Sequence, residues 1–157
     1  MMTWGVTSVI FWRRGNKEIP REVLDAIEQA AREALTQVGC SNIRSKVKKN
    51  KIEALADASG DPDLSGALLV AMATITRALA SMGYTVEGSD QILEASKTFL
   101  ESGSLSGLII DKIMSKTVNA AVARLEAERG GERFIIGIEA VRFFGKIGYT
   151  VSVSKEK

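Results

Sequence analysis

The chain has 157 residues, of which 45% are hydrophobic and 25% charged, and its net charge is +2. This length and composition are typical of one folded soluble domain with a sizeable core. The chain contains no histidine and one cysteine, Cys40, which excludes intrachain disulfides, histidine-based nucleophile pairs, and zinc or iron–sulfur sites built on histidine or on several cysteines.

The first elements predicted along the chain are a strand and an amphipathic helix. Residues 6–13 form a short β-prone run that ends in a turn at 14–16. Pro20 suits the first turn of a helix that continues to about Val38, with apolar side chains recurring along one face. The N-terminus lacks the cationic start and long apolar stretch of a signal peptide, so we expect no export and a cytoplasmic location.

The next predicted element is a β-hairpin with its turn at residues 48–51, and it contains a cluster of cations. The segment from Ser41 to Ile52 has no acid, and its cations are Arg44, Lys46, Lys48, Lys49 and Lys51. One face of the hairpin pairs small or apolar residues that suit a core, namely Val47 with Ile52, Ser45 with Ala54, and Ile43 with Ala56. The other face pairs Lys46 with Glu53, Arg44 with Leu55, and Lys48 with Lys51. The like charges near the tip repel each other.

The rest of the chain is predicted to be mainly helical. Asp61 and Pro62 combine an N-cap acid with a proline at the first helical position, and they begin an apolar helix that continues to about Met82. Its uncharged stretch, residues 64–76, is too short to span a bilayer, so burial is favoured over membrane insertion. After a strand at 84–86, helices are expected over about 89–101, 104–129 and 132–147, followed by a strand at 149–153.

The order strand, helix, hairpin, helix, strand over about residues 5–88 predicts an α+β fold of the ferredoxin-like β-α-β-β-α-β type. Residues 89–157 would add a helical extension that ends in one strand, all within a single domain of residues 1–157. Residues 77–86 and 142–151 both begin with an arginine and end in Gly-Tyr-Thr-Val, with the glycine six residues after the arginine. We interpret them as two similar helix-to-strand corners rather than as a duplication.

The sequence predicts no catalytic residue, cofactor or metal site, and it favours a protein that is not an enzyme. Asp57, Asp61 and Asp63 offer oxygen ligands, but their spacing fails the calcium-loop pattern, and helix capping explains Asp61. Cys40 follows a helix C-terminus, where the helix dipole disfavours a thiolate. Catalysis would have to rely on carboxylates, lysine or tyrosine.

The cation cluster indicates a surface for nucleic-acid phosphates. Arg13 and Arg14 follow the first predicted strand and extend this patch, so the predicted nucleic-acid-binding residues are Arg13, Arg14, Arg44, Lys46, Lys48, Lys49 and Lys51. None of the nine aromatic residues lies in the hairpin, and the candidates for exposed rings are Trp4, Trp12, Tyr84 and Tyr149. Base stacking is therefore not predicted.

The favoured function is a non-catalytic binding or assembly subunit that contacts nucleic acid without sequence specificity and forms a homo-oligomer or joins a larger complex. Two alternatives remain open. The protein could be a small ferredoxin-like enzyme or small-ligand-binding protein with its site at a subunit interface. It could also be a purely structural oligomerisation module, whose lysines only protect an exposed strand edge from aggregation.

Overall fold

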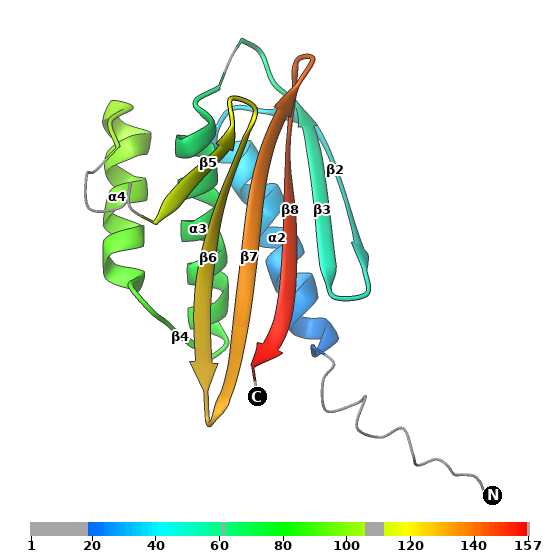
Figure 1. Ribbon diagram of the computed structural model, residues 1–157, viewed down its shortest axis with the longest axis vertical. Coiled ribbons are helices and arrows are strands. Elements are labelled where there is room, and N and C mark those ends of the chain that lie inside the picture. Colours follow the sequence, from blue (N-terminus) through cyan, green and yellow to red (C-terminus); the bar gives the residue numbers. More distant parts are fainter. Residues whose placement is uncertain (1–18, 61, 106–111, 157) are drawn as a thin grey trace, which may run out of the picture.

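The computed structural model describes residues 19–60, 62–105 and 112–156, which form an α+β fold with one antiparallel sheet and three helices (Figure 1). The sheet has seven strands in the order β2-β3-β8-β7-β6-β4, and β5 also pairs with β6. The strands are β2 (Ser41–Lys48), β3 (Lys51–Asp57), β4 (Thr85–Val86), β5 (Ile113–Thr117), β6 (Ala120–Arg129), β7 (Glu132–Phe143) and β8 (Lys146–Glu156). The predicted first strand, with Arg13 and Arg14, lies outside the described residues.

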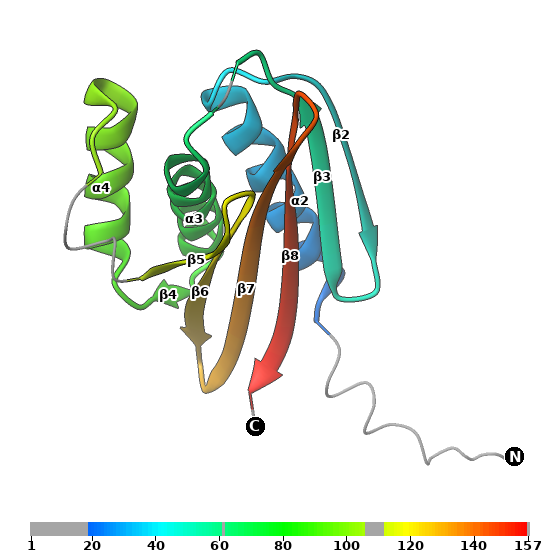
Figure 2. The ribbon, with the colours of Figure 1, turned by 45° about the horizontal axis from the view of Figure 1, so that its top comes forward.

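The helices cover one face of this sheet (Figure 2). Helices α2 (Arg21–Gln37) and α3 (Leu64–Ser81) pack on the sheet, and α4 (Ser89–Ser102) packs on α3. A Cβ atom at Gly66 would lie 2.0 Å from Cζ of Phe99, so glycine allows the Phe99 ring of α4 to lie directly against α3. These three helices confirm the helices predicted over 20–38, 61–82 and 89–101, although α3 begins at Leu64 rather than at Pro62.

Helix α3 is the centre of the hydrophobic core. It is long and apolar enough to cross a membrane, but most of its residues are buried against the sheet, α2 and α4. Tyr149 of β8 is buried, and its hydroxyl donates a 2.6 Å hydrogen bond to the carbonyl oxygen of Ala67 in α3. The helix therefore has the surroundings of a core helix in a soluble α+β domain.

The prediction of two helices over residues 104–129 and 132–147 is wrong. Within the described part of this region the chain forms β5, β6, β7 and the beginning of β8. Every second residue of β6 and β7 is buried, which is the period of a strand; these residues are Ala121, Ala123, Leu125, Ala127, Phe134, Ile136, Ile138 and Ala140. Gly130 and Gly131, which we expected to end a helix, form the turn between β6 and β7, with φ of 57° and 88°.

The predicted ferredoxin-like arrangement is not confirmed, because the sheet is larger and its strands pair differently. The hairpin strand β3 pairs with the C-terminal strand β8, whereas β4 lies at the opposite edge and pairs with β6. Of the extension predicted to be helical after residue 88, α4 is a helix, but β6, β7 and β8 contribute the centre of the sheet. The register of the hairpin is confirmed from Arg44 to Leu55, with Lys46 opposite Glu53 and Lys48 opposite Lys51. The predicted pairing of Ile43 with Ala56 is not found, because an irregularity between Ser41 and Arg44 shifts the register there.

Candidate functional site

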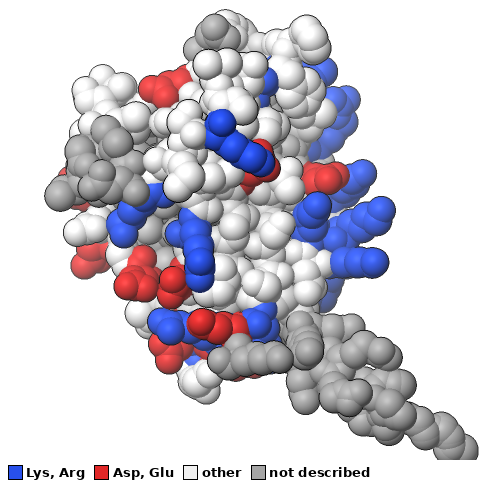
Figure 3. Space-filling view, in the orientation of Figure 1, with Lys and Arg blue, Asp and Glu red and all other residues white. Residues whose placement is uncertain are grey.

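Four of the five hairpin cations lie on the face of the sheet that the helices leave uncovered. Alternate residues of a strand point to the same face, so Arg44, Lys46 and Lys48 of β2 share a face with Lys51 of β3. The fifth, Lys49, lies in the turn and has a φ of 56°. All five are exposed, and Figure 3 shows Lys and Arg side chains gathered along the hairpin side of the molecule.

Acidic residues neutralise little of this charge. Nζ of Lys46 lies 3.5 Å from Oε1 of Glu53, and both side chains are exposed to solvent. Among the described residues, no acid forms an ion pair with the other four cations of the hairpin. An exposed ion pair is worth about 0–1 kcal/mol, so Lys46 also stays available to an anionic partner.

A polar network on the other face attaches β2 to helix α2. Nη1 of Arg32 donates a 2.9 Å hydrogen bond to Oγ of Ser45, and this hydroxyl donates in turn to Oε2 of Glu28 at 2.7 Å. Ser45 is half-buried between two exposed cations of β2. The strand that carries the cations is therefore held to the helical layer at its middle.

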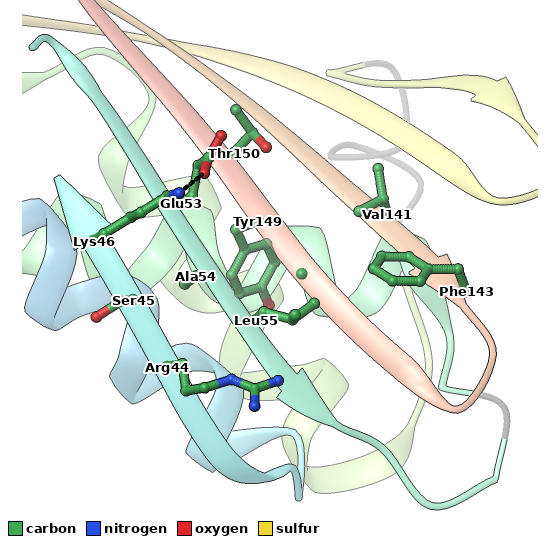
Figure 4. Close-up of a pocket in the computed structure, with 11 residues that line it drawn as sticks. Arg44, Ser45, Lys46, Glu53, Ala54, Leu55, Val141, Phe143, Tyr149 and Thr150 are labelled. Atoms are coloured by element: carbon green, nitrogen blue, oxygen red, sulfur yellow. Dashed lines mark ion pairs between the residues drawn. The ribbon is translucent and has the colours of Figure 1, made fainter. Parts of the chain in front are cut away.

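Next to the hairpin, the uncovered face contains a hollow of about 420 Å³ that crosses from β2 to β7. Arg44 lies on one side of it and Phe143 on the other, and Leu55, Gly148 and Val141 lie between them (Figure 4). Thr150 lies beside Glu53 at one end. Gly148 has no side chain, so nothing fills the hollow at this position. A Cβ atom there would lie 2.9 Å from the carbonyl oxygen of Ala54 and 3.2 Å from Cδ1 of Leu55.

A hydrogen-bonded carboxylate, Asp57, lies on the same face of β3, two residues beyond Leu55. Nδ2 of Asn42 donates to Oδ2 at 2.8 Å, and Nζ of Lys146 donates to Oδ1 at 2.6 Å. These two hydrogen bonds hold the pKa of Asp57 below its ordinary value. Because Lys146 and Asn42 already bind this carboxylate, it repels an incoming anion less than an unpaired acid would.

Two exposed aromatic residues were missed by the sequence analysis, Phe143, which lines the hollow, and Phe144, which follows it. Phe143 is 43% exposed and Phe144 is fully exposed, at the turn between β7 and β8. We had placed both in a helix, and we had taken Tyr84 and Tyr149 as candidates for exposed rings. Both tyrosines are buried, which corrects that expectation. The signal for the turn was a bulky residue followed by glycine between two β-prone runs, and Phe144 and Gly145 both have positive φ.

The other residues considered from the sequence do not join this site. Asp63, rather than Asp61, caps α3 by accepting a hydrogen bond from the backbone N–H of Gly66, and Asp61 lies outside the described residues. Cys40 is half-buried, and burial raises the pKa of its thiol, which disfavours a nucleophilic thiolate. In the part of the chain that the structure describes, no group of three or more acids or cysteines is arranged to hold a metal ion.

Comparisons with protein-family models, curated proteins and solved structures find no match for this chain. Its function is therefore argued from the geometry of this site.

Proposed function

We propose that the protein is a non-catalytic nucleic-acid-binding subunit that contacts phosphate groups through the uncovered face of its β2–β3 hairpin. The observation that supports this most strongly is the register, which places Arg44, Lys46, Lys48 and Lys51 on one face. The hairpin acids on this face are Glu53 and Asp57, and Asp57 is already paired with Lys146. Alternate residues along a strand are about 6.7 Å apart. The three cations of β2 thus form a regular row that can follow an extended phosphate backbone.

The contact proposed here is electrostatic and independent of sequence. Each phosphate that a lysine or arginine neutralises releases condensed counterions, so the affinity falls as the salt concentration rises. The uncovered face offers few groups arranged to read base edges, since the floor of the hollow is formed by Gly148 and Thr150. Assembly into a homo-oligomer or a larger complex, in the cytoplasm, remains part of the proposal.

The hollow favours a second candidate function, the binding of a small phosphorylated ligand. Its volume of about 420 Å³ lies within the range of roughly 300–1,000 Å³ that small-molecule sites occupy. Arg44 and Lys46 would bind the phosphate, and Leu55, Val141 and Phe143 would contact an apolar part of the ligand. A free nucleotide that competes with a nucleic acid at micromolar concentration would favour this candidate.

Fluorescence anisotropy with labelled single-stranded and duplex DNA and RNA at 50 and 200 mM salt tests the proposed function. The native chain is compared with a variant in which Lys46, Lys48, Lys49 and Lys51 are all changed to Ser. A control variant changes four exposed cations elsewhere, Arg21, Arg77, Lys97 and Lys112, to Ser and so has the same net charge. We expect steeply salt-dependent binding that the hairpin variant loses and the control variant largely retains. Equal losses in both variants, or no binding by the native chain at 50 mM salt, would contradict the proposal.

A further inference from the structure

We propose that the hollow binds an unpaired base of a single-stranded nucleic acid and that the base stacks on Phe143. This inference rests on the proposed function and assigns its substrate class, single strands rather than duplexes. It also assigns a role to Phe143 and Phe144, which the cation cluster alone leaves unexplained.

The positions of Arg44 and Phe143 fit the two ends of a nucleotide. Arg44, Leu55, Gly148 and Val141 form one row across β2, β3, β8 and β7, and Phe143 lies two residues further along β7. Three spacings between neighbouring strands amount to roughly 14 Å. The side chains of Arg44 and Phe143 both extend inward over the hollow (Figure 4), so the gap between them is shorter than this spacing. A phosphate at Arg44 would place its base near the Phe143 ring.

The lining of the hollow suits the flat face of a base. Leu55, Val141 and Phe143 form its apolar sides, and the small residues Gly148 and Thr150 leave its floor open. Aromatic side chains stack on any base, because every base presents a π-face, and such stacking is tolerant of sequence. The hollow therefore combines an apolar stacking site with a cation at its edge.

Phe144 gives independent support for this substrate class. It is fully exposed and has a φ of 43°, a backbone conformation that bulky residues rarely adopt. A large aromatic residue held in this conformation and entirely in water is unfavourable for the isolated protein, and such outliers concentrate at binding sites. A second base, next to the one on Phe143, would cover this ring. In a duplex the bases are stacked and paired with one another, so neither phenylalanine could reach a base face.

The first experiment compares three labelled probes of about 12 nucleotides, a length within the site sizes of single-strand-binding folds. They are a single-stranded oligothymidylate, a duplex containing that strand, and an abasic strand that has the same phosphates without bases. We expect the native chain to bind the oligothymidylate at least about fivefold more tightly than the abasic strand at the same salt concentration, as one stacked base would give. We also expect it to bind the duplex less tightly than the oligothymidylate.

Variants then locate the stacking site. Phe143→Leu removes the ring and keeps an apolar side chain, and Phe144→Ser changes a fully exposed residue. Each should weaken oligothymidylate binding by at least about fivefold and leave abasic-strand binding unchanged. Leu100→Ser, at an exposed apolar residue of α4 on the helical side, is the control and should change neither affinity. Phe143→Trp should retain the affinity and show fluorescence quenching on binding beyond that of the native chain, which contains Trp4 and Trp12.

Failure of this inference is distinguishable from failure of the proposed function. Equal affinities for all three probes, lost when the hairpin lysines are changed to Ser, would leave phosphate binding in place and overturn base stacking. Binding of none of the probes would overturn both.

Discussion

Lys48 and Lys51 lie directly opposite each other across the β2–β3 hairpin, as cross-strand partners in the sheet. Two like charges in this relation destabilise a sheet by about 0.2–1 kcal/mol. Lys49 in the turn between them adds a third positive charge. A repulsive arrangement of this kind lowers stability without a compensating contact within the described hairpin, and such costs are typical of residues that bind a partner.

Lys51→Glu should therefore stabilise the protein while it weakens nucleic-acid binding. The new carboxylate would face Lys48 and replace a repulsive pair with an attractive one, so the free energy of unfolding should rise by about 0.2–1 kcal/mol. Urea unfolding followed by circular dichroism gives the stability, and anisotropy gives the affinity. A loss of stability would show that the two side chains do not interact across the hairpin.

Lys46→Glu is the matched comparison, since it makes the same charge change two strand positions away. Lys46 faces Glu53, so this variant replaces an attractive pair with a repulsive one and should lower the free energy of unfolding by a similar amount. Both variants should weaken nucleic-acid binding. If the two variants have opposite effects on stability but both weaken binding, the effect of the hairpin cations on folding is separate from their contact with nucleic acid.

Glu53→Gln should strengthen nucleic-acid binding. Glu53 lies opposite Lys46 on the binding face, and its removal frees Lys46 and reduces repulsion of the incoming phosphates. The pair is exposed, so we expect a gain of at most about fivefold in affinity, which corresponds to about 1 kcal/mol. Glu101→Gln makes the same charge change at an exposed position of α4 and should leave the affinity unchanged. A weaker complex with Glu53→Gln would mean that Glu53 positions Lys46 rather than competing for it.

The sequence was sufficient to predict the basic hairpin and the register of its cations, because that register depends on local information. Shifting the pairing by one residue would move Val47 and Ile52 to the uncovered face and Lys46 and Glu53 into the core. The three helices were also predictable, since their apolar faces recur at helical spacing and Pro20 and Gly88 mark two of their N-termini.

The C-terminal strands were not predicted, because residue type and burial pattern disagreed there. Alanine, glutamate and arginine favour helices, and they make up most of β6. Burial of every second residue, as in Phe134, Ile136 and Ile138, would have indicated a strand. The hollow was missed for the same reason, since it depends on β8 lying between β3 and β7. Pairing between residues 55 and 148 is a tertiary relation that no local pattern reveals.

The hydrogen bond between Tyr149 and Ala67 should contribute measurably to stability. Tyr149→Phe removes the donor to the Ala67 carbonyl inside the core, and we expect the free energy of unfolding to fall by about 0.5–1.5 kcal/mol. Tyr84→Phe is the contrasting variant. The Tyr84 ring packs on Phe134 and under the Arg129 guanidinium, but among the described residues its buried hydroxyl has no hydrogen-bond partner.

Tyr84→Phe should therefore leave the free energy of unfolding unchanged or raise it, because burial of an unpaired hydroxyl is unfavourable. Urea unfolding of both variants at neutral pH makes the comparison. Equal losses in the two variants would show that the hydroxyl of Tyr84 has a partner in solution.

Asp57 should make stability depend on pH in the acid range. Its pKa in the folded protein lies below the ordinary value of about 3.9, chiefly because Asn42 and Lys146 donate hydrogen bonds to the carboxylate. A lowered pKa means that the folded state holds the proton less tightly than the unfolded state. The stabilisation is therefore fully present above the ordinary pKa, and it is lost as the pH falls through the lower pKa of the folded state.

Asp57→Asn should accordingly be less stable than the native chain at pH 7, and the difference should shrink as the pH falls below about 4. Urea unfolding from pH 7 to pH 2 measures it, and the difference between the two proteins removes the contribution of the other acids. Asn42→Ala provides a second test, because it removes the partner with the largest effect on this pKa while leaving the carboxylate in place. In the native chain, Asn42→Ala should weaken the pH dependence of the free energy of unfolding. In the Asp57→Asn variant, the same substitution should leave that pH dependence almost unchanged. A stability difference between Asp57→Asn and the native chain that stays constant down to pH 2 would show that these hydrogen bonds do not distinguish the charged carboxylate from the neutral one.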